Sequence, residues 1–128
     1  MIDRNQVDEL ETLIGQLSSL HSEMTGLTKK SSTDAVNAFK LKLINKTLIR
    51  CNDLLGDAYM PFEEFAQFDS DDVPSNSDVT LMLGQYQAAI ENFRSDHIRS
   101  RQGVWFYDLP DGESSVRALA PDRLKVKK

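Results

Sequence analysis

The sequence predicts a mainly α-helical fold, a three-helix bundle with a short aromatic helix between helices 2 and 3 and a C-terminal β-hairpin. Three segments carry apolar residues at alternating spacings of three and four, which is typical of amphipathic helices. After Gly103 the spacing changes to an aromatic, strand-like run. A length of 128 residues suits one domain. We expect that domain at 1–119, with the hairpin at 104–119 and a basic, mobile tail at 120–128.

The first helix is expected at residues 4–26. Its apolar stripe has a heptad-like spacing that suits packing in a bundle, and consists of Leu10, Leu13, Leu17, Leu20, Met24 and Leu27. Gly26 and the polar residues 29–32 interrupt the pattern. We therefore expect the helix to end there.

The second helix is expected to begin after Thr33 or Asp34 as its N-cap. Gly56 is expected to end it. Its inward stripe includes Leu41, Ile44, Leu48, Cys51 and Leu55, with Val36, Leu43 and Leu54 beside it. The lone cysteine lies on this stripe, so we interpret it as a small core residue.

The segment after the second helix contains three phenylalanines spaced three apart. Pro61 is a favourable first residue for a short helix that would place Phe62, Phe65 and Phe68 along one side. Residues 69–78 are rich in turn and cap formers, and Ser75 or Ser77 is expected to cap the third helix. That helix is predicted to reach about Arg101. Its inward residues are Val79, Met82, Leu83, Tyr86, Ala89, Ile90 and Phe93.

The C-terminal hairpin is predicted from the run at 104–109, a turn at 110–113 and a returning strand at 114–119. A two-stranded hairpin is marginal alone, so it must pack on the helices or on a partner.

The charge distribution is strongly uneven. No lysine or arginine occurs between Cys51 and Phe93, whereas the rest of the chain is net positive although the whole protein has a formal charge of −5. The nine carboxylates of this stretch are Asp53, Asp57, Glu63, Glu64, Asp69, Asp71, Asp72, Asp78 and Glu91. Such a division indicates that the middle of the chain meets something cationic.

The candidate partner-binding residues are the carboxylates that helix capping does not explain, together with an aromatic residue among them. They are Glu63, Glu64, Asp69, Asp71, Asp72 and Phe65. Lys42, Lys46 and Arg50 recur every four residues and form a basic ridge on the second helix. We expect a non-catalytic interaction or regulatory protein that binds a basic protein surface or a second copy of itself, as a homo-oligomer. The plainer interpretations are a solvated charged face and a phenylalanine cluster in the core.

No metal site or cofactor is expected. Asp69, Asp71 and Asp72 could bind a hard cation, but no glycine follows at the required place and Thr80 stands where an EF-hand has glutamate. Phosphate loops, zinc spacings and nucleophile elbows are absent from the sequence. The pI of about 4.9 argues against a general nucleic-acid binder.

An alternative function is RNA binding or RNA cleavage. On a third helix reaching Arg101, the spacings of Arg94, His97 and Arg101 would place an imidazole between two guanidiniums. His97 also continues the apolar stripe of that helix, so a buried or capping role is the plainer interpretation. The basic tail offers a further route to nucleic acid. The N-terminus does not have the pattern of a signal peptide, and no apolar run is long enough to cross a bilayer. We therefore expect a cytoplasmic protein that does not bind membranes. The compact chain without low-complexity segments suggests a prokaryotic cell.

Overall fold

The computed structural model describes residues 2–110 and 116–122, and it confirms the predicted fold class. Three long helices, α1 (Arg4–Lys30), α2 (Ala38–Tyr59) and α3 (Asn76–Asp96), are followed by an antiparallel hairpin of β1 (Ile98–Arg101) and β2 (Val104–Tyr107). A single 3-10 turn, η1 (Ser70–Asp72), lies between α2 and α3.

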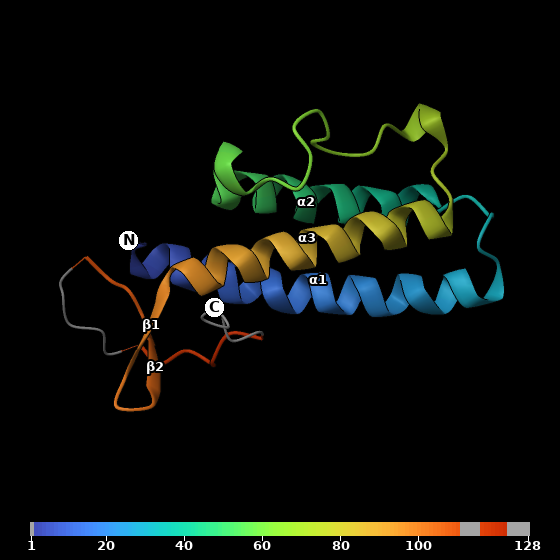
Figure 1. The fold of residues 1–128 in the computed structure, drawn as a ribbon. Helices are drawn as coiled ribbons and strands as arrows, with labels where there is room; N and C mark the ends of the chain where they lie inside the picture. The colour runs from blue at the N-terminus through green and yellow to red at the C-terminus, as the bar shows by residue number, and fades with distance from the viewer. Residues whose placement is uncertain (1, 111–115, 123–128) are drawn as a thin grey trace, which may run out of the picture.

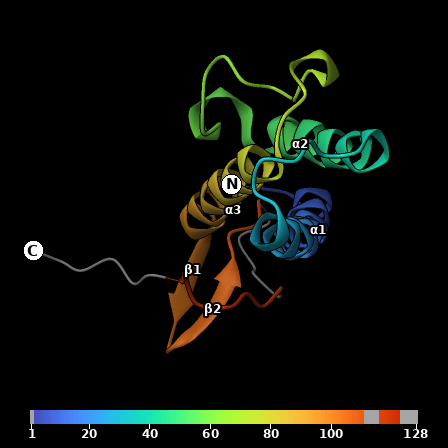
Figure 2. The same ribbon diagram turned by 90° about the vertical axis from the view of Figure 1, so that its right-hand side faces the viewer.

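The helices form a bundle in which α1 runs antiparallel to both α2 and α3 (Figures 1 and 2). Because α2 and α3 run in the same direction, residues 60–75 must return along the length of the bundle before α3 can begin (Figure 1). We call residues 60–75 the acidic connection. The hairpin lies at the opposite end of the bundle from the start of α3 (Figure 1).

The core is built from the predicted stripes. Each helix contributes a row of fully buried residues, represented by Leu13 of α1, Leu48 of α2 and Leu83 of α3. Cys51 is also buried, as expected from its place on the stripe. Burying a side chain of this size contributes roughly 1.5–3 kcal/mol each relative to an exposed one, so these rows supply the main force that holds the helices together.

The end of α1 and the start of α2 differ from the prediction. α1 continues past Gly26 to Lys30, since a single glycine in a helix interior costs only about 1 kcal/mol and two lysines in the last turn complement the helix dipole. α2 begins later than predicted, with Asn37 as its N-cap. The backbone of Asp34 is used elsewhere, because its carbonyl accepts a hydrogen bond from the Asn76 amide at the start of α3.

Residues 60–75 do not form the predicted aromatic helix from Pro61. Residues 61–69 are irregular, and the helical turn comes later, at Ser70–Asp72. Gly56 is where the regular geometry of α2 is interrupted, at φ +64°, although one further turn follows to Tyr59. Ser75, one of the two predicted caps, is the N-cap of α3, and Asp78 completes a capping box with it.

The strands of the hairpin are not the pair that was predicted. β2 pairs with β1, which precedes it, through a two-residue turn in which Gln102 and Gly103 both have positive φ. The predicted return strand is partly present on the other edge of β2, where Tyr107 donates to the Val116 carbonyl and Ala118 donates to the Trp105 carbonyl, both at 3.0 Å. The predicted turn lies largely in 111–115, outside the described residues.

Candidate functional site: the acidic connection and the outer face of α2

The acidic connection is fixed to the bundle by two asparagines of α2. Asn45 forms a pair of hydrogen bonds with Phe68, donating to its carbonyl and accepting from its amide, both at 2.9 Å. One heptad further along, Asn52 donates to the Ala66 carbonyl at 2.8 Å. These side chains take the place of helical hydrogen bonds, which explains why residues 61–69 are ordered without being a helix.

A buried tyrosine of α3 also contributes to this attachment. The Tyr86 hydroxyl of α3 donates to Asn52 Oδ1 at 2.7 Å, so α3, α2 and the connection are linked in series. Burial raises the pKa of Tyr86, and the bond to Asn52 opposes that shift only in part. Tyr86 therefore remains a neutral phenol that can donate this hydrogen bond at physiological pH.

The three phenylalanines of the connection have two different environments. Phe65 and Phe68 are half-buried, pack edge-to-face at 5.0 Å, and Phe65 also contacts the ring of Tyr86. Phe62 instead leaves 48% of its surface exposed. Two of the rings therefore anchor the connection, whereas the third belongs to the outer surface.

The carboxylates of the connection face solvent. Asp69 caps η1 by accepting from the Asp71 amide at 2.9 Å. Glu63, Glu64, Asp71 and Asp72 are exposed, and none forms an ion pair with any residue that the structure describes. Together with Phe62 and Asp69 they make up what we call the acidic surface.

The basic ridge lies directly beside this surface. Lys42 and Lys46 are exposed, and with Phe68 and Asp69 they line a groove of about 630 Å³ between α2 and the connection. Arg50 turns the other way, to α1, where it forms an ion pair with Glu9; the hydrogen bond from Arg50 lowers the pKa of that carboxyl. Two of the three predicted ridge cations thus remain free of ion pairs within the described chain.

The outer face of α2 also exposes large apolar side chains, which the sequence reasoning missed. Phe39 is 71% exposed, and Leu43 and Ile49 are each 43% exposed. The missed signal was the spacing of four between Phe39 and Leu43, which places them on the same helical face as Lys42 and Lys46. We call Phe39, Lys42, Leu43, Lys46 and Ile49 the outer face of α2.

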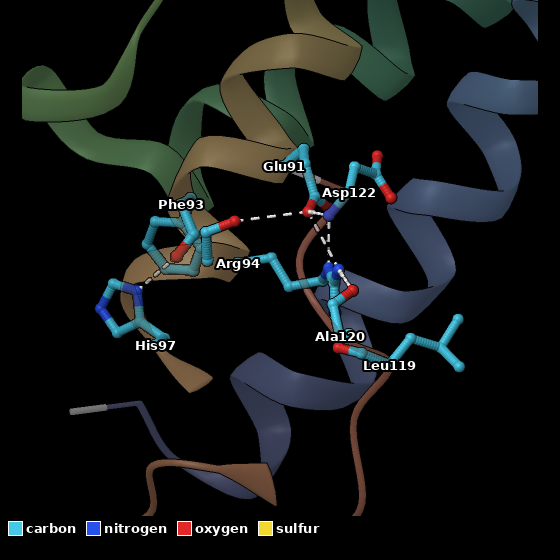
Figure 3. Close-up of polar contacts among 8 residues, drawn as sticks. Glu91, Phe93, Arg94, His97, Leu119, Ala120 and Asp122 are labelled. Carbon is cyan, nitrogen blue, oxygen red and sulfur yellow. Dashed lines mark hydrogen bonds and ion pairs between the residues drawn. The ribbon is translucent and has the colours of Figure 1, made fainter. Parts of the chain in front are cut away.

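The predicted trio of Arg94, His97 and Arg101 is not on one helical face, and that prediction is wrong. α3 ends at Asp96, His97 is its C-cap, and Arg101 is an exposed residue at the end of β1. His97 Nδ1 lies 2.7 Å from the Phe93 carbonyl and its ring stacks on Phe93 (Figure 3). Sequence spacing could not show where α3 ends, because residues 98–101 combine apolar and polar residues as the last turns of the helix do.

Arg94 is buried and holds the C-terminal segment in place. It donates two hydrogen bonds to the Glu91 carboxylate, at 2.7 and 2.9 Å, and one each to the Leu119 and Ala120 carbonyls (Figure 3). The Asp122 amide donates to Glu91 at 3.0 Å (Figure 3). Burial disfavours the charged form of Glu91, but the bonds from Arg94 and Asp122 outweigh it and lower its pKa. The guanidinium of Arg94 is therefore committed to structural contacts, not presented to a phosphate.

Cys51 is not a nucleophile in this fold. Burial in the core raises the pKa of its thiol to about 12. At neutral pH the group is therefore a neutral thiol with no access to solvent.

Comparison of the chain with protein-family models, with curated proteins and with solved structures found no match in any of the three. Within the described residues, no helix is long and apolar enough to cross a membrane. In the same part of the chain, histidines, cysteines and carboxylates do not gather in any group of three or more that could hold a metal ion. The basic tail residues 123–128, one predicted route to nucleic acid, lie outside the described part of the chain.

Proposed function

We propose that this chain is a non-catalytic protein-interaction module whose acidic surface binds a basic protein surface. The observation that carries the proposal is the contrast within the connection itself. Its backbone is fixed by Asn45 and Asn52, whereas its carboxylates Glu63, Glu64, Asp71 and Asp72 form no ion pair with any described residue.

Fixed, unpaired charges favour recognition over stability. The conformational entropy of the connection is lost when the protein folds, so less entropy is lost when a partner binds. Exposed carboxylates steer a cationic partner into contact, and Phe62 adds an apolar anchor at the edge of the charged patch. The charges contribute specificity and association rate, and the aromatic ring contributes buried apolar area.

The proposal is tested with a fourfold neutral variant, Glu63→Gln, Glu64→Gln, Asp71→Asn and Asp72→Asn, as bait in affinity capture beside the wild type. We expect the wild type to retain a defined protein at low salt and to release it as salt rises, because charge pairing at a surface is screened. The variant should lose that protein. A control that neutralises Asp8 and Glu11, exposed carboxylates of α1, should retain it.

Equal capture by the wild type and the fourfold variant would show that the acidic surface is not the binding surface. Both variants should keep the helical circular dichroism of the wild type, so that a loss of capture reports on the surface and not on folding.

A further inference from the structure

The acidic surface has a complementary neighbour on the same chain. The outer face of α2 combines two cations, Lys42 and Lys46, with three exposed apolar side chains, Phe39, Leu43 and Ile49. The acidic surface combines carboxylates with the exposed ring of Phe62. The two halves thus carry opposite charges, and each also exposes an aromatic ring.

The two halves adjoin each other on one side of the bundle. Asn45 and Asn52 attach the connection along one flank of α2, and Lys42, Lys46 and Asp69 line the groove between them. Figure 2 shows the connection crossing beside α2 on the side away from α1. Within one chain, however, neither Lys42 nor Lys46 forms an ion pair with a described carboxylate of the connection.

A second copy can satisfy both halves at once. A two-fold axis between adjacent patches of opposite charge places the basic patch of each copy on the acidic patch of the other. We propose that the outer face of α2 and the acidic surface together form a self-complementary interface for a two-fold dimer. This dimer rests on the proposed function, and its partner is a second copy of this chain.

The charge pattern explains why such a dimer can form although each copy has a formal net charge of −5. Interactions between exposed charges farther apart than about 10 Å are largely screened at 0.1 M salt. Local pairs of lysine and carboxylate therefore outweigh the overall repulsion. The exposed apolar residues on both halves, Phe39 at 71% and Phe62 at 48%, would supply the apolar centre that a stable interface needs.

The test uses two charge-reversal variants of the full chain. Lys42→Glu with Lys46→Glu makes both halves negative, and changing Glu63, Glu64, Asp71 and Asp72 together to lysine makes both halves positive. Sedimentation equilibrium should show a monomer–dimer equilibrium for the wild type, weakened by about tenfold or more in each variant, because a two-fold interface contains every altered contact twice. An equimolar mixture should recover heterodimers, since each negative half then faces a positive one.

The matched control is Lys29→Glu with Lys30→Glu, which makes the same change in net charge on exposed residues at the end of α1. This variant should dimerise like the wild type. A wild type that stays monomeric, a charge-reversal variant of either half that dimerises as well as the wild type, or a mixture of those two variants that recovers no heterodimer would each overturn the dimer.

Failure of the dimer and failure of the proposed function are distinguishable. A monomeric wild type whose captured protein is lost on neutralising the acidic surface contradicts only the dimer. If the fourfold neutral variant captures as the wild type does, the acidic surface itself is refuted, whatever the oligomeric state.

Discussion

Two irregular segments of this protein are held to the bundle in different ways. The C-terminal segment at 119–122 is attached by charged side chains, Arg94 and Glu91, which are consumed by the attachment. The acidic connection is attached by neutral amides, Asn45 and Asn52, and its charged side chains take no part in the attachment. A charged residue thus contributes to stability or to recognition according to whether the fold has already paired it.

The largest expected effect is the loss of Arg94. Arg94→Met would leave the Glu91 carboxylate in a largely enclosed site without its ion-pair partner and would release two backbone carbonyls. We expect the free energy of unfolding to fall by about 3 kcal/mol. Urea denaturation followed by the fluorescence of Trp105, whose carbonyl pairs with Ala118, measures it.

The matched control for Arg94 is Arg101→Met, which removes an exposed guanidinium from β1. Its effect should stay within about 0.5 kcal/mol, as for most surface substitutions. Similar losses in both variants would show that Arg94 is not the residue that holds the C-terminal segment.

The next effect concerns the attachment of the connection. Asn45→Ala removes both hydrogen bonds to Phe68, and we expect a loss of about 2 kcal/mol, at about 1 kcal/mol for each bond. Hydrogen exchange of the Phe68 amide should become faster, since that amide donates to Asn45. Lys46→Ala, one residue further along α2, serves as control and should leave this amide protected.

Acid should loosen the attachment of the C-terminal segment. The pKa of Glu91 is lowered in the folded state, so its contribution to stability is complete above its ordinary pKa of about 4.5 and is lost as the pH falls through the lower folded value. We expect the wild type to lose stability below pH 4.5 more steeply than Glu91→Gln. Urea midpoints recorded across this range measure the difference, and parallel curves would contradict the assignment.

The smallest expected effect is on the acidic surface. Neutralising Glu63, Glu64, Asp71 and Asp72 together should change the free energy of unfolding by no more than about 0.5 kcal/mol in total, with a gain where like charges no longer repel. Thermal denaturation checks this. A large loss of stability would mean that these carboxylates are structural, which would remove the basis for a binding role.

The sequence predicted well what depends on periodicity and poorly what depends on tertiary contacts. The buried stripes, including Leu48, Cys51 and Leu83, followed directly from a spacing of three and four. The end of α3 and the pairing of β2 did not, because Ile98–Arg101 reads as a continued helix until the positive-φ turn at Gln102 and Gly103 is seen.

The candidate site shows the same division. The carboxylates and Lys42 and Lys46 were identified from charge alone, and they are exposed. The roles of Asn45, Asn52 and Phe39 could not be predicted, since they depend on where the connection lies across α2. Arg94 was misassigned for the same reason: its partners at 119–122 are distant in sequence.

The most direct test of the central claim is a dilution series of two-dimensional amide NMR spectra on the wild type. We predict that self-association shifts the amides of residues 39–49 and 62–72 together. The amides of Arg94, Leu119, Ala120 and Asp122 should stay unchanged, because the charges of that second region are already paired. Shifts confined to the hairpin and the C-terminal segment, or none at any concentration, would contradict the account.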